Sequence, residues 1–87
     1  MVEVFEYGGL QFEWDRRKAA GNLMKHVVSF PHAATTFGDD RAAIVRDLDH
    51  SDSEERWRQI AISTVGDLLV TGYTLAQRAL ESSSQGP

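Results

Sequence analysis

Five residues of this 87-residue chain have side chains suited to acid–base chemistry on a phosphodiester, and they lie close together. They are His50, Glu54, Glu55, Arg56 and Arg58. Cleaving RNA without a metal ion requires a base for the 2′-hydroxyl, a cation for the phosphorane and an acid for the leaving 5′-oxygen. Histidine and glutamate can transfer protons, and arginine can hold the charge. We take His50 with Glu54 or Glu55 as the proton-transfer candidates, and Arg56 and Arg58 as the phosphate contacts. The alternative is a strand-end arginine paired with loop acids, and composition alone favours it.

A second polar group precedes this stretch. Lys18, Asn22 and Lys25 recur at helical spacing, and the neighbouring charged residues are Arg16, Arg17 and His26. Only Asp15 opposes the basic residues of this segment, so we interpret Arg16, Arg17, Lys18, Lys25 and His26 as a surface for RNA or for an acidic protein partner. The alternative is a helix face that is merely solvated.

Composition restricts the class of protein. Nine basic and thirteen acidic residues give a net charge of −4, which argues against a nonspecific nucleic-acid coat protein. The chain has no cysteine, its first residues lack the positive charge of a signal peptide, and no apolar run approaches the ~20 residues of a membrane span. We therefore expect a single cytoplasmic domain without membrane association.

The sequence offers no convincing metal site. The spacing of His26, His32 and His50 matches no common ligand pattern. The loop that begins at Asp47 has Asp52 where a calcium loop needs glycine and Arg58 where it needs glutamate. We expect no metal and no other cofactor.

The polar residues must be positioned by a small α+β fold. Alternating residues around Gly8 and Gly9 predict a hairpin of strands 2–4 and 10–14. The apolar spacing predicts a helix from Asp15 to about His26, and a second helix from about Phe30 to Phe37, with Pro31 in its first turn. Strands are expected at 42–45, 56–65 and 68–74, with a polar loop at 47–55, which predicts two helices on an antiparallel sheet.

The last residues have fewer apolar side chains. Residues 74–80 could form a short helix, and 81–87 read as a disordered, Ser-rich tail, so the domain is expected to span 1–80. The predicted core is Phe12, Trp14, Leu23, Val27, Phe30, Phe37, Ile44, Ile60, Ile62, Leu69 and Val70. Trp57 is left open, because strand alternation places it opposite Ile60 and Ile62.

Several of these residues occur in the order and at the spacings of a known family. The chain resembles the BrnT-type toxins, whose pattern runs FEWD-x-x-K-x-x-x-N-x-x-K-H-G-V-S-F and later D-x-x-H-S-x-x-E-E-R. The matching positions include Phe12–Asp15, Lys18, Asn22, Lys25, His26, Ser29, Phe30, Asp49–Ser51 and Glu54–Arg56. The resemblance covers about residues 12–74. It implies a RelE-like fold and a metal-independent ribonuclease toxin, neutralised by a BrnA-like antitoxin that represses the shared operon with it.

The chain departs from that pattern at two places. Val27 replaces the family's glycine, and the R-x-I-S-A-R-type strand and basic C-terminal helix have no counterpart after Thr74. We therefore expect the last family strand and helix to be missing. The alternative function is a degenerate toxin that binds protein without catalysis. Its strand 68–74 would have an open edge, which a partner, a second copy in a homodimer or the chain's own C-terminal segment could cover.

Overall fold

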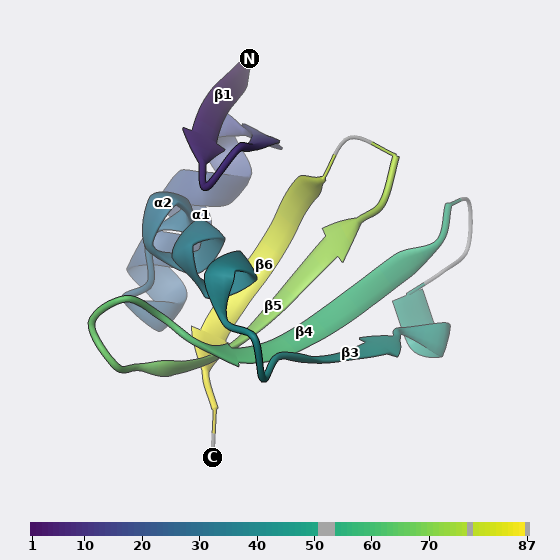
Figure 1. Cartoon of the computed structure of the whole chain (residues 1–87). Coiled ribbons are helices and arrows are strands. Elements are labelled where there is room, and N and C mark those ends of the chain that lie inside the picture. The colour runs from purple at the N-terminus through teal and green to yellow at the C-terminus, as the bar shows by residue number, and fades with distance from the viewer. Residues whose placement is uncertain (51–53, 77, 87) are drawn as a thin grey trace.

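Two helices pack on one six-stranded sheet (Figure 1). The structure, a computed structural model, describes residues 1–50, 54–76 and 78–86, without the side chain of His50. The strand order is β1-β2-β6-β5-β4-β3. The elements are β1 (Val2–Tyr7), β2 (Leu10–Asp15), α1 (Arg16–His26), α2 (Phe30–Ala34), the 3₁₀ turn η1 (Thr35–Gly38), β3 (Ala43–Arg46), the 3₁₀ turn η2 (Leu48–His50), β4 (Arg56–Ile62), β5 (Leu68–Thr74) and β6 (Ala79–Gln85). The predicted α+β class with two helices is confirmed.

Capping residues set where both helices begin. The Asp15 carboxylate accepts a hydrogen bond from the backbone N–H of Arg17 at 2.7 Å, and this bond is the main reason that the pKa of Asp15 lies below its usual value. The Ser29 hydroxyl accepts from the backbone N–H of His32 at 3.2 Å, and Pro31 occupies the first turn of α2. Both starts agree with the sequence prediction. The second helix becomes a 3₁₀ turn after Ala34 rather than continuing regularly to Phe37.

Val27 ends α1 in a conformation that suits glycine better. Its φ is 58° and its ψ is 34°, in the left-handed region, and its N–H bonds to the Leu23 carbonyl. A β-branched residue is strained there, because its Cβ crowds the backbone. The turn thus forms with Val27 in place of the family's glycine, at the cost of this strain.

The residues expected to form a helix and a disordered tail instead contain a strand. β6 lies between β5, to which it is antiparallel, and β2, to which it is parallel. The sheet is therefore mixed, and the predicted helix at 74–80 and tail at 81–87 are wrong. The prediction that the last strand is missing is likewise wrong, and the edge of β5 is closed by β6 from Leu69 to Thr74. A homodimer through that edge is excluded because its backbone groups are already paired.

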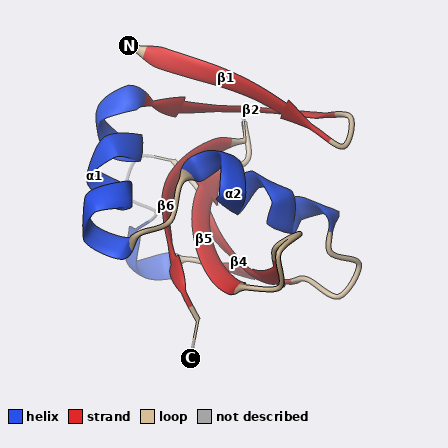
Figure 2. Cartoon of the chain, turned by 90° about the vertical axis from the view of Figure 1, so that its left-hand side faces the viewer, coloured by secondary structure: helices blue, strands red, loops and turns tan. Residues whose placement is uncertain are grey.

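The core lies between the sheet and the helices. It consists of Phe12, Trp14, Val28, Phe30, Ala33, Ala34, Leu69, Tyr73 and Leu80, with Phe37 and Trp57 packed against it. Figure 2 shows α2 crossing in front of β6 and β5, with α1 beside β6. Aromatic rings meet edge to face, as in Phe12 with Phe37 at 4.9 Å between ring centroids.

Five predicted core residues are exposed instead: Leu23, Val27, Ile44, Ile60 and Ile62. The error on β4 is one of phase, because Gln59 and Ala61 face the helices while Ile60 and Ile62 lie on the uncovered face. Buried Gln59 donates to the Thr36 hydroxyl at 2.9 Å, which removes the cost of an unpaired amide N–H.

Asp39 joins η1 to the far end of β4. One of its carboxylate oxygens accepts from the Ile62 backbone N–H at 2.8 Å and the other from the Arg41 backbone N–H at 2.9 Å. These two bonds, the one from Ile62 first, hold the pKa of Asp39 below its usual value. The carboxylate thus terminates the strand and fixes the turn that leads to β3.

Candidate functional site

A polar hollow of about 290 Å³ lies between α1 and the outer surface of β4 and β6. Its lining includes three cations, Lys18, Lys25 and Arg56, together with His26 and Glu81. The helical residues follow one another along α1 at spacings that keep them on one side of the helix. Of the sequence-predicted site residues, the structure brings these four together: Lys18, Lys25, His26 and Arg56.

Glu81 lies between two of the cations. Its Oε1 accepts from Lys18 Nζ at 2.7 Å and from Arg56 at 2.9 Å, and its side chain is only 12% exposed. Both bonds are charge-assisted, and both join elements that are far apart in sequence. Glu81 therefore fixes α1 and β4 relative to β6 at the base of the hollow.

A β-bulge gives Glu81 its orientation. Across β5, Gly72 pairs with Ser82 and Tyr73 pairs with Leu80, so Glu81 is the extra residue without a partner in the ladder. A bulge of this kind redirects one side chain while its neighbours keep their faces. Leu80 and Ser83 both remain buried, and Glu81 is turned toward the cations.

Asn22 holds α1 against β6. Among the described residues, β2 pairs with β6 only at Glu13 and Ala79, so most of this edge of β6 is left to α1. Asn22 donates to the Ser83 carbonyl at 2.8 Å and accepts from the Ser83 N–H at 2.9 Å. It also donates to the Val28 carbonyl at 2.9 Å. A side-chain amide thus takes the place of a neighbouring strand and sets the distance between the helical cations and Arg56.

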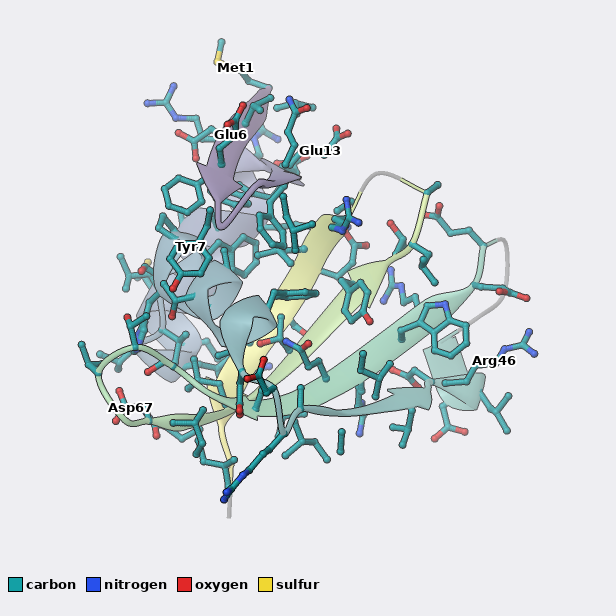
Figure 3. All side chains as sticks on the ribbon, in the orientation of Figure 1. Met1, Glu6, Tyr7, Glu13, Arg46 and Asp67 are labelled. Atoms are coloured by element: carbon teal, nitrogen blue, oxygen red, sulfur yellow. The ribbon has the colours of Figure 1, made fainter. Side chains whose placement is uncertain are left out.

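The other candidates of the catalytic set do not line this hollow. Arg58 faces Asp47 at 3.4 Å and Glu55 faces Arg46 at 3.4 Å, around a second hollow on β3 and η2. Glu54 is exposed. Figure 3 shows Arg46 at the end of the sheet that lies farthest from the helices. The side chain of His50 lies outside the described residues.

The basic helix face is divided between different environments. Arg17 is exposed in the first turn of α1, and Arg16 is 3.8 Å from Glu3 on the hairpin. Lys18 is exposed as well, but unlike Arg17 it forms an ion pair with the nearly buried Glu81. Arg16 and Arg17 do not contribute to the lining of the hollow.

Sequence reasoning missed Glu81 as a site residue because it placed the residue in a tail. The one available signal was Leu80 followed by Glu81 and a run of serines, which is weak evidence for a strand. Among the residues that the structure describes, no three histidine, aspartate or glutamate side chains converge into a metal-binding group. No helix in the same part of the chain is long and apolar enough to span a bilayer.

Comparison with known proteins gives one family. The family model for the ribonuclease toxin BrnT, of type II toxin–antitoxin systems, matches residues 14–81, which is most of the chain. The match includes both helices and ends at Glu81, so it covers every described residue named as lining the hollow except Ser82. The comparison with curated proteins gives no match. The resemblance noted from the sequence is thus confirmed: the chain belongs to the BrnT family of ribonuclease toxins of type II toxin–antitoxin systems.

Proposed function

We propose that this toxin cleaves RNA in the hollow between α1 and β6, by attack of a 2′-hydroxyl on the adjacent phosphate and without a metal ion. The products would be a 2′,3′-cyclic phosphate and a 5′-hydroxyl. One observation carries the proposal: residues 18, 25 and 26 of a helix and residue 56 of a distant strand converge on one open cavity. Three cations beside a histidine supply both charge stabilisation and proton transfer.

Each residue has a role that follows from its chemistry. Arg56 and Lys18 bind the non-bridging phosphate oxygens, since a guanidinium and an ammonium donate to them at fixed charge. Lys25 contacts a neighbouring phosphate along the strand of RNA. His26 protonates the leaving 5′-oxygen, because imidazole exchanges protons near neutral pH.

The second hollow provides the competing assignment. Arg58 and Glu55 are both engaged in ion pairs there, and Glu54 lies nearby in the chain. With His50 these residues form the alternative proton-transfer and phosphate-binding set that the sequence indicates. Alanine variants at positions 50, 54, 55 and 58 therefore belong in the same assay.

The test is incubation of the purified protein with RNA in EDTA. We expect products that end in cyclic phosphate, and we expect Arg56→Ala and His26→Ala to lose most of the activity. Arg41→Ala is the charge-matched control for Arg56→Ala, because Arg41 is exposed and lies away from the hollow. Full activity in the Arg56 and His26 variants, with loss in the variants at 50, 54, 55 or 58, would move the site to the second hollow.

The family membership implies an antitoxin partner. We propose that this partner is a BrnA-like protein, that the complex forms in the cytoplasm, and that an acidic antitoxin segment contacts the basic residues 16–18 and 25 of α1. Affinity should then fall as salt screens these charges. Copurification with the neighbouring gene product at low and high salt tests this.

A second candidate function is a protein-binding module without catalysis. It is supported by Glu81, whose carboxylate bonds to two of the cations that would otherwise hold phosphate. Intact RNA in the EDTA assay, no growth arrest on expression and retained antitoxin binding would together favour this function.

A further inference from the structure

Glu81 is the only carboxylate among the described residues that line the hollow. Its position combines features that an ordinary surface ion pair lacks: little exposure, a bulge that redirects it, and two cations from different elements. A solvated ion pair contributes little to stability, whereas a bulge interrupts the ladder locally. At this position the regular pairing of β5 and β6 is interrupted, and the carboxylate lies beside the two cations.

We propose that Glu81 is a catalytic residue, the general base that takes the proton from the 2′-hydroxyl of RNA. The inference rests on the proposed ribonuclease function and extends it to a residue outside the family pattern noted in the sequence. Both cations bond to Oε1, and Oε2 receives no hydrogen bond from the described residues, so Oε2 is the oxygen that can accept a proton.

The geometry fits the order of atoms in RNA. The attacked phosphate is attached to the 3′-oxygen, next to the 2′-hydroxyl, so a base for that hydroxyl must lie beside the cations that hold the phosphate. Glu81 lies at hydrogen-bond distance from both Lys18 and Arg56. When RNA binds, these two cations can contact the phosphate while still orienting the carboxylate, since each has several donors.

The step balances without a further reactant. Glu81 Oε2 takes the 2′-hydroxyl proton, the 2′-oxygen forms a bond to phosphorus, and the bond from phosphorus to the 5′-oxygen breaks. The 5′-oxygen leaves with a proton from the His26 imidazolium. The products are the cyclic phosphate and the 5′-hydroxyl, with Glu81 protonated and His26 neutral, and exchange with water restores both groups.

The first experiment compares Glu81→Gln with wild type in single-turnover cleavage of RNA. We expect the rate to fall about 10²- to 10⁴-fold, the usual contribution of a general base. Binding of a fully 2′-O-methylated RNA, which cannot be cleaved, should be equal or tighter. Glu6→Gln is the matched control, since it removes the same charge on the β1–β2 hairpin, away from the hollow, where Figure 3 labels Glu6.

The second experiment separates the base from the acid. A nucleoside 3′-phosphate ester with a p-nitrophenol leaving group needs no proton on its departing oxygen. With it, His26→Ala should recover much of its lost rate, whereas Glu81→Gln should stay slow because the 2′-hydroxyl still needs a base. Recovery of both variants to the same degree would overturn the role of Glu81.

A shorter carboxylate keeps the proposal testable if the glutamine variant does not fold. Glu81→Asp retains the charge between Lys18 and Arg56 but withdraws the oxygen by one methylene, and a misplacement of about 1 Å can cost about 10²-fold. We expect slow cleavage with unchanged binding of the methylated RNA, and wild-type cleavage by this variant would overturn the proposal.

The failure of each proposal has its own pattern. Wild-type protein that leaves RNA intact would overturn the ribonuclease function and the inference with it. If wild type cleaves RNA and Glu81→Gln cleaves it at the same rate or faster, the inference alone is overturned. Glu81 would then be only a counter-ion that competes with phosphate.

Discussion

Replacing Asn22 with alanine should destabilise the protein more than any exposed substitution on α1. The change leaves the N–H and carbonyl of Ser83 without their side-chain partner and removes a bond to the Val28 carbonyl, and both residues are fully buried. Each buried backbone group left unsatisfied costs about 1 to 3 kcal/mol. Alanine regains up to about 0.7 kcal/mol of helix propensity. With the three groups near the low end of that range, the net loss should be about 2 to 4 kcal/mol.

The measurement is urea unfolding followed by tryptophan fluorescence, with a thermal melt beside it. A loss of about 2 to 4 kcal/mol corresponds to a fall in Tm of roughly 10 to 20 °C for a domain of this size. Met24→Ala is the control on the same helix, because Met24 is 87% exposed, and its effect should stay within about 0.5 kcal/mol. A loss below about 1 kcal/mol for Asn22→Ala would refute the role of Asn22 as a substitute for a strand.

Three further predictions concern single residues. Val27→Gly should raise the free energy of unfolding by about 0.5 to 1 kcal/mol, since it relieves the left-handed strain at a side chain that packs little, and a lower urea midpoint would contradict this. Lys18→Glu should lower the free energy of unfolding by about 1 to 2 kcal/mol, because it places a like charge beside nearly buried Glu81. Arg17→Glu, in the first turn of α1, should leave the stability almost unchanged. Equal urea midpoints for the two variants would count against the ion pair. Because its pKa is lowered in the folded state, ionised Asp39 stabilises the fold at pH values above 3.8, the usual pKa of an aspartate. This contribution is lost as the pH falls through the folded pKa. Wild type should therefore lose more stability between about pH 5 and pH 2 than Asp39→Asn does, and parallel curves would disprove the linkage.

Local signals in the sequence predicted most of the first half of the fold. The Gly8–Gly9 turn, the Asp15 and Ser29 caps and the position of Pro31 each act within a few residues, so their consequences can be read from neighbours alone. The predicted starts of both helices and the predicted end of α1 are accordingly close to those observed, whereas α2 ends at Ala34 instead of Phe37.

The errors occur where long-range packing decides. β6 has few apolar residues, and its strand conformation depends on β5, β2 and Asn22, which no local pattern reveals. On β4 apolar side chains occur on both faces, so alternation could not tell which face the helices cover. Glu81 belongs to the site through a bulge and two distant cations, and that convergence is visible only in the folded chain.

The central position of β6 has a consequence for synthesis of the toxin. A ribosome produces β1 and β2 first and β6 last of all the strands, yet β6 alone joins the hairpin to β5, β4 and β3. Contacts of such long sequence separation form slowly, because they close large loops. In the emerging polypeptide, Lys18 and Arg56 therefore stay separated until residue 81 has left the exit tunnel and can bond to both. An antitoxin that is present during this interval would meet a toxin whose hollow is still incomplete.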